Sequence, residues 1–178
     1  HQFGIYFLHY QPEMNTLPEA GFYCDQFQAI SKIASALPKG VRLIVKEHPT
    51  TFRQNDRRWR PHGFYNRIES IPNVQMSSLD IDVFKLIDNA KFVASISGVS
   101  LTEALVRGSP VVIFNTARFY HFPKEFVIDA NTASVSELRI SLERICSHKF
   151  RFSENKMLAC LKAVARDGYD GSDNDSFI

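Results

Sequence analysis

Long hydrophobic runs are absent from this 178-residue sequence. The uncharged run Pro110–Phe114 is far shorter than the about 20 residues that span a bilayer, so we expect no transmembrane helix. Cysteine is scarce as well, and Cys24, Cys146 and Cys160 show no metal-ligand spacing. An odd cysteine count fits a reducing compartment better than a disulfide framework, and we therefore expect a cytoplasmic protein.

A charge excess of one sign is also lacking. Lys and Arg number 21 against 19 Asp and Glu, which gives a net charge of +2. This value is too small for a general polyanion-binding surface, so we expect no nucleic-acid partner. The sequence contains no GxxxxGK[ST] loop, no GxGxxG after the first strand, no HExxH and no GxSxG. We expect neither a metal ion nor a further cofactor.

The remaining pattern is an alternation of β-branched runs with segments of helical period. It is typical of βα units around a parallel sheet, and the length suits one core. We expect a domain over residues 1–166 and a polar, flexible tail over 167–178. The predicted strands are Phe3–Tyr10, Val41–Lys46, Val74–Ser77, Phe92–Ile96 and Pro110–Phe114. The predicted helices begin near Phe27, Phe64, Val83 and Leu101 and cover Val135–Cys146 and Glu154–Val164.

Polar side chains follow three of these strands. They lie in the segments His9–Glu13, Lys46–Pro49 and Ser95–Glu103. Ligands of open α/β sheets bind beyond the carboxyl ends of the strands, so these segments are the candidates for a binding site. At Ser97-Gly98 a small residue admits a ligand to the backbone, and the next helix offers free N–H groups to a phosphate. A plain N-cap turn with a first-turn Glu103 explains the same residues.

The segment Lys46-Glu47-His48-Pro49 is more specific, because Pro49 favours an extended His48 that can face a cleft. A loop histidine that caps a neighbouring element remains the alternative. In the first segment, Pro12 holds Gln11 and Glu13 at the end of the strand, where Glu13 either faces a substrate or is solvated.

The arginine-rich loop Arg53–Arg60 fits either an anionic acceptor or a solvated loop. In the second case its arginines pair with Asp56 and Glu69, and we assign no site there.

In this order the motifs resemble the capsule polysaccharide biosynthesis proteins, a family that includes bacterial Kdo transferases using CMP-Kdo. The resemblance covers about Ile5–Tyr120. It rests on Leu8–Glu13 with Thr16-Leu17-Pro18, on Val45–Pro49, on Ser97-Gly98 through Glu103-Ala104-Leu105, and on Gly108–Val112. It implies a three-layer, Rossmann-like α/β domain, the C-terminal donor-binding half of a GT-B glycosyltransferase.

The resemblance also implies roles for single residues. His48 and Pro49 match a His-Pro pair implicated in nucleotide binding, and Phe119-Tyr120 matches an aromatic pair lining the same cleft. The donor-binding set it implies is Gln11, Glu13, Lys46, His48, Pro49, Ser97, Gly98, Ser100, Glu103 and Tyr120. Its catalytic residues stay unassigned. The chain departs from the family at Val99, where a threonine is usual, and at Leu101, where a glycine is usual.

Further expectations concern the partners. The sequence enters a strand at once and reads like a chain cut mid-protein, so we expect a separate N-terminal acceptor-binding domain and little turnover without it. The expected partners are a CMP-sugar donor and a polysaccharide or glycolipid acceptor, and a peripheral position at the inner face of the membrane stays open. The alternatives are a GT-B-like polyol-phosphate transferase of wall-polymer synthesis and a non-catalytic scaffold of the same fold. Val99 and Leu101 favour the scaffold.

Overall fold

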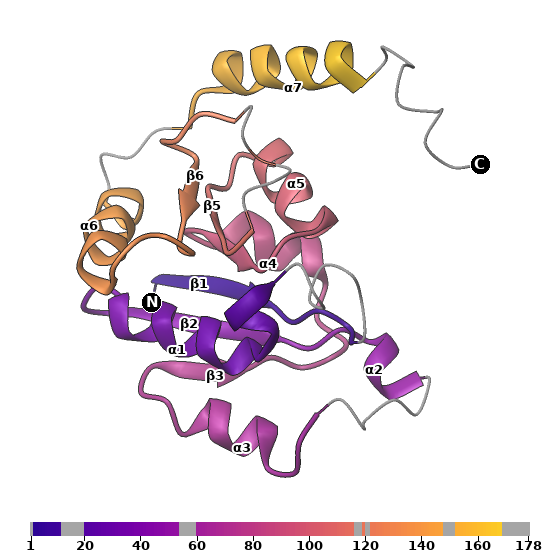
Figure 1. The fold of residues 1–178 in the computed structure, drawn as a ribbon, viewed down its shortest axis with the longest axis vertical. Coiled ribbons are helices and arrows are strands. Elements are labelled where there is room, and N and C mark those ends of the chain that lie inside the picture. Colours follow the sequence, from indigo (N-terminus) through magenta and orange to yellow (C-terminus); the bar gives the residue numbers. More distant parts are fainter. Residues whose placement is uncertain are drawn as a thin grey trace.

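The strands form one parallel sheet (Figure 1). The computed structural model describes residues 2–11, 20–53, 60–115, 119, 122–147 and 152–168. Its strands are β1 (Gln2–Phe7), β2 (Val41–Lys46), β3 (Val74–Met76), β4 (Val93–Ser95), β5 (Val111–Ile113) and β6 (Val127–Asp129). They are ordered β3-β2-β1-β4-β5-β6, and each neighbouring pair is parallel.

This strand order contains a reversal that matters for ligand binding. From β1 the chain adds β2 and β3 on one side, and it then returns to place β4, β5 and β6 on the other side. The longest register joins β1 to β2, from Gln2↔Val41 to Phe7↔Lys46, while β4 pairs with the other side of β1 through Ile5↔Val93. The carboxyl ends of β1 and β4 therefore meet at a topological switch point, where open α/β sheets bind ligands.

Helices cover both faces of the sheet. They are η1 (Gly21–Cys24), α1 (Gln26–Ala36), α2 (Thr50–Arg53), α3 (Phe64–Glu69), α4 (Val83–Asn89), α5 (Val99–Val106), α6 (Val135–Cys146) and α7 (Glu154–Gly168). Alternate strand residues enter two cores, since side chains alternate between the faces of a strand. One core joins α1, α3 and α6, and the other joins α4, α5 and α7. The three-layer α/β fold is thus confirmed.

The helix starts follow from capping side chains. Asp25 accepts from the amide of Phe27 at α1, and Asp82 accepts from the amides of Phe84 and Lys85 at α4. Ser134 opens α6 with a reciprocal capping box. Such side chains satisfy amides that a helix start leaves without partners.

Some predicted bounds were wrong. The first strand ends at Phe7 and not at Tyr10, and the strands near Val74, Phe92 and Pro110 are each three residues long. The edge strand β6 was not predicted, and α7 continues to Gly168, two residues into the segment expected as a tail. No helix in the described part of the chain has the length and apolar character needed to cross a membrane.

Candidate functional site

A cavity of about 370 Å³ lies at the switch point. The carboxyl ends of β1, β2 and β4 and the first residues of α4 and α5 line it. These residues are Phe7, Leu8, His9, Tyr10, Lys46, Glu47, His48, Pro49, Val83, Ser95, Gly98, Val99 and Ser100. The three polar segments found in the sequence therefore meet in one cavity, although they are far apart along the chain.

The ring of His9 links β1 to β4. Its Nε2 lies 3.0 Å from the hydroxyl of Ser95 and accepts from the amide of Ser97 at 3.3 Å. An amide can only donate, so the second contact requires an unprotonated Nε2 and a ring proton on Nδ1. The Ser95 hydroxyl also lies 2.9 Å from the Phe7 carbonyl and gives its single proton to one of these acceptors. His9 thus joins the two strand ends at the switch point.

His48 lies on the β2 side of the same cavity. Its Nδ1 accepts from the amide of Thr50 at 3.3 Å, which places the ring proton on Nε2. The Tyr10 ring is tilted against the imidazole, with the centroids 6.2 Å apart. His48 therefore does what the alternative reading expected, capping the short helix α2, and it lines the cavity as well.

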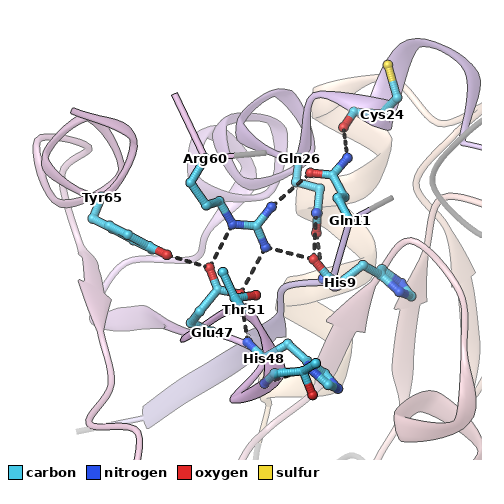
Figure 2. A network of polar contacts seen from close by, with 10 residues as sticks. His9, Gln11, Cys24, Gln26, Glu47, His48, Thr51, Arg60 and Tyr65 are labelled. Carbon is cyan, nitrogen blue, oxygen red and sulfur yellow. Dashed lines mark hydrogen bonds and ion pairs between the residues drawn. The ribbon is translucent and has the colours of Figure 1, made fainter. Parts of the chain in front are cut away.

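A buried polar network lies behind the two histidines (Figure 2). Its centre is the ion pair of Arg60 with Glu47, whose side chains are only 4% and 2% exposed. Arg60 Nε and Nη2 donate to Glu47 at 2.7 and 2.9 Å, and Glu47 also accepts from the Tyr65 hydroxyl at 2.8 Å. Figure 2 shows the rings of His9 and His48 pointing away from the guanidinium.

The protonation states of this network follow from its contacts. Burial alone lowers the pKa of Arg60, but the hydrogen bonds and charge of Glu47 more than offset this and raise it. The pKa of Tyr65 is raised by burial and by the negative charge of Glu47. Arg60 therefore stays charged and Tyr65 stays a donor. The solvated-loop alternative, in which the arginines pair with Asp56 and Glu69, does not hold for Arg60, which is buried and pairs with Glu47.

Lys46 lines the cavity, but its amine is held by the main chain. Nζ donates to the carbonyls of Ser78 and Leu79 at 3.3 and 2.9 Å. Burial lowers the pKa of this amine, and the charge of Asp80 opposes the shift. Lys46 thereby fixes the loop between β3 and α4 beside the cavity.

The N-terminus of α5 opens on the cavity without a side-chain cap. Its N-cap is Gly98, with φ of +105°, and within the described part of the chain no side-chain cap is present. The hydroxyl of Ser97 is buried and has no hydrogen-bond partner among the described residues. Ser97 itself is only 2% exposed and is not among the residues that line the cavity, so the feature that suits a polar ligand is the uncapped start of α5 at Gly98, Val99 and Ser100.

The two departures from the family motif lie differently in the structure. Leu101 is fully buried in the core beside α5, whereas Val99 is 72% exposed at the cavity. Leu101 therefore does not occupy the cavity.

The other predicted site residues are not all brought together. Gln11 is held in the buried network, since it accepts from Arg60 at 2.8 Å and donates to the Cys24 carbonyl at 3.0 Å. Glu103 lies one turn into α5, outside the residues that line the cavity. Glu13 and Tyr120 lie outside the described residues. Phe119, expected in the same cleft, lines a second cavity of about 470 Å³ beside β6 instead.

Sequence reasoning missed His9, Glu47, Ser95 and Arg60 as parts of the site. The first three stand inside the quoted polar segments, so their place after a strand was a usable signal. Arg60 belongs to a run of arginines, and nothing in the sequence distinguishes the buried one. Among the described residues, no group of three or more His, Cys, Asp and Glu side chains is arranged to hold a metal ion.

The sheet order and the polar strand ends gathered at its switch point define a Rossmann-like domain, which resembles one half of GT-B glycosyltransferases. The family model described as capsule polysaccharide biosynthesis protein matches residues 22–123, more than half of the sequence. The chain belongs to this family. No curated protein sequence matches it.

Solved structures show the same fold. The chain is similar to UDP-GlcNAc 2-epimerase from Methanocaldococcus jannaschii, with a TM-score of 0.56, 15% identity, and coverage of 93% of this chain and 46% of that one. For the catalytic domain of cholesterol-alpha-glucosyltransferase from Helicobacter pylori the values are 0.51, 11%, 93% and 99%. For S. aureus MnaA, determined with UDP, they are 0.50, 12%, 94% and 46%. The chain thus spans under half of the epimerase and of MnaA.

Proposed function

We propose that this domain binds the nucleotide-sugar donor of a glycosyltransferase in capsular or surface polysaccharide synthesis. The donor class is a CMP-activated sugar such as CMP-Kdo. The observation that carries the proposal is the convergence of His48-Pro49 with Gly98 and Ser100 on one cavity at the switch point. Its volume of about 370 Å³ falls in the range of small-ligand sites, about 300–1,000 Å³.

The charges around the cavity favour a donor with a single phosphate. Lys46 is the one Lys or Arg among the described lining residues, and two carbonyls hold its amine. An anion would therefore meet imidazoles and the amides at the start of α5. Because a diphosphate carries more negative charge than the single phosphodiester of a CMP-sugar, the small number of cations in this lining is our reason for proposing the less charged donor.

The proposed roles of Gly98, Ser100 and His48 rest on their place in the cavity lining, whereas those of Ser97 and Glu103, which do not line it, rest on the family motif. The start of α5, with Ser97, Gly98 and Ser100, takes the phosphate, and His48 contacts the nucleotide. Glu103 is the proposed ribose contact, and Gln11 supports the strand ends from behind. Helix amides and a histidine facing the phosphate stabilise the charge that develops on the leaving CMP.

The whole enzyme needs more than this domain. We propose that a second, acceptor-binding domain supplies the base that activates a polysaccharide or glycolipid hydroxyl. In that arrangement this half positions the sugar and stabilises the leaving group. The proposed place of action is the cytoplasm, at the inner face of the membrane.

The two alternatives differ in their ligand. A polyol-phosphate transferase of wall-polymer synthesis would use a CDP-alcohol, and the fold also holds UDP in S. aureus MnaA. A scaffold would bind no nucleotide. Val99 at the cavity favours the scaffold, whereas Leu101 does not, because it lies in the core.

Calorimetric titration with CMP, CDP and UDP tests the proposal. We expect selective CMP binding that is at least tenfold weaker in His48→Ala and in Glu103→Ala. The matched controls are His62→Ala and Glu143→Ala, both at exposed positions away from the cavity, and they should bind as the wild type does. Preference for CDP or UDP, or no binding of any of the three, would contradict a CMP-sugar site.

A further inference from the structure

We propose that Arg60 is a positioning residue that fixes His9 and His48 in the cavity without lining it. The inference rests on the proposed function for the identity of the ligand. The orientation of the two imidazoles by Arg60 does not depend on that function and can be tested without a ligand. Arg60 reaches the network from the segment that precedes α3, and the cavity lining does not include it.

Arg60 holds the loop after β1 directly. Its Nη2 donates to the main-chain carbonyl of His9 at 2.7 Å, and its Nη1 donates to the side chain of Gln11 at 2.8 Å. Gln26 supports the same peptide, because it accepts from the His9 amide at 2.8 Å and donates to the His9 carbonyl at 3.1 Å. The His9 backbone is thus held by Arg60 and Gln26 (Figure 2), and its ring contacts Ser95 and Ser97.

Arg60 holds the loop after β2 through Glu47. Besides the ion pair, Glu47 Oε1 accepts from the amide of His48 at 2.7 Å and from the hydroxyl of Thr51 at 3.2 Å. The carboxylate therefore orients the peptide that carries His48 at the start of α2. One guanidinium thus sets both imidazoles of the cavity, one through a carbonyl and one through a carboxylate.

The planar fork of arginine suits this position. Arg60 donates four hydrogen bonds to three residues, two to Glu47 and one each to Gln11 and the His9 carbonyl. A lysine presents a single point charge and cannot reproduce that set. Arg60→Lys keeps the charge near Glu47 but releases the His9 carbonyl or Gln11, so it tests geometry rather than charge.

The test combines two readouts on Arg60→Lys. Long-range ¹H–¹⁵N NMR of labelled histidine reports the tautomer of each ring, and calorimetry reports the affinity for CMP. We expect the variant to lose the Nδ1–H form of His9 required by the Ser97 contact, to shift the His48 ring signals, and to bind CMP at least tenfold more weakly. Arg107→Lys alters an exposed fork, paired with Asp88, and should change neither readout.

A milder variant keeps the proposal testable if Arg60→Lys does not fold. Tyr65→Phe removes one hydroxyl from Glu47, and we expect a smaller shift of the His48 signals and about threefold weaker CMP binding. Folded Arg60→Lys and Tyr65→Phe proteins with wild-type ring signals would overturn the positioning role. If the wild type binds no nucleotide, the proposed function fails, while the ring signals still decide the role of Arg60.

Discussion

Gly98 combines two constraints that a larger residue cannot meet. Its φ of +105° lies in a region that side chains rarely adopt, and an added Cβ would lie 3.1 Å from Cε1 of His9. The glycine therefore allows the start of α5 and the His9 ring to approach each other closely. A side chain here would alter both the stability of the turn and the shape of the cavity.

A comparison of alanine substitutions at two glycines with positive φ separates the contact of Gly98 with His9 from the backbone strain that both substitutions cause. For Gly98→Ala we expect a loss of about 1–3 kcal/mol in the free energy of unfolding, measured in urea, and weaker CMP binding. Gly108→Ala is the control, because Gly108 has φ of +83° but its Cβ would meet Phe152 at an ordinary 3.6 Å. Equal loss of CMP affinity in both variants would contradict a local role of Gly98 in the cavity.

The Arg60–Glu47 pair predicts an asymmetry between buried and exposed ion pairs. Glu47→Gln leaves the Arg60 charge buried without a counter-ion, which should cost about 3–5 kcal/mol in chemical unfolding. Asp88→Asn, in the exposed pair with Arg107, should cost far less, because water screens that pair. Similar losses in the free energy of unfolding for the two substitutions would show that burial does not make the loss of a partner more costly.

Single residues also show where sequence reasoning ends. His48 and the Ser97–Ser100 turn could be predicted, because polar residues after a buried strand must lie at the edge where ligands bind. Arg60 could not be predicted, since its role depends on one guanidinium reaching Glu47 from the segment before α3. Local pattern carries no such long-range contact.

At the scale of elements, capping chemistry sets the helix bounds. α6 begins at Val135 as predicted, because Ser134 accepts from the amide of Glu137 while the Glu137 carboxylate accepts from the amide of Ser134. The missed strand β6 has three residues and lies at the edge of the sheet, where it pairs with β5 alone among the described strands. Short edge strands depend on pairing with a neighbour, which a local pattern does not reveal.

The capping box predicts a dependence of stability on pH. Hydrogen bonds from Ser134 lower the pKa of Glu137, so the ionised carboxylate stabilises the fold. This contribution is present at neutral pH and is lost as the pH falls below about 4, through the lowered pKa. Urea unfolding should show Glu137→Gln less stable than the wild type at pH 7 and nearly equal to it at pH 3. A stability difference between the two proteins that persists at pH 3 would show that the negative charge of Glu137 is not its source.

The Ser134 side chain itself should contribute at both pH values. Ser134→Ala removes the acceptor for the Glu137 amide, and we expect a loss of about 1 kcal/mol in the free energy of unfolding. Ser136→Ala removes the hydroxyl that lies 3.0 Å from the Ser134 hydroxyl and should cost less, because it leaves the acceptor for the Glu137 amide in place. Equal losses would mean that the serine hydroxyl does not cap α6.

For the whole molecule, the class of fold could be predicted but the order of strands could not. Alternating β and α segments already indicate a parallel sheet. The order β3-β2-β1-β4-β5-β6 depends on where the chain returns after β3, and only the structure shows it. That order brings His9, His48 and Gly98 to one cavity. The comparisons agree at this scale, with a shared family and a shared fold.

Mapping CMP onto the domain by ¹H–¹⁵N NMR tests the central claim most directly. With increasing CMP we expect saturable shifts of the Ser97, Gly98 and Ser100 amides and of the His9 and His48 rings. The cavity beside β6, lined by Phe122 and Asp129, should stay unchanged. Shifts confined to that second cavity, or saturation by UDP but not by CMP, would contradict a CMP-sugar site at the switch point.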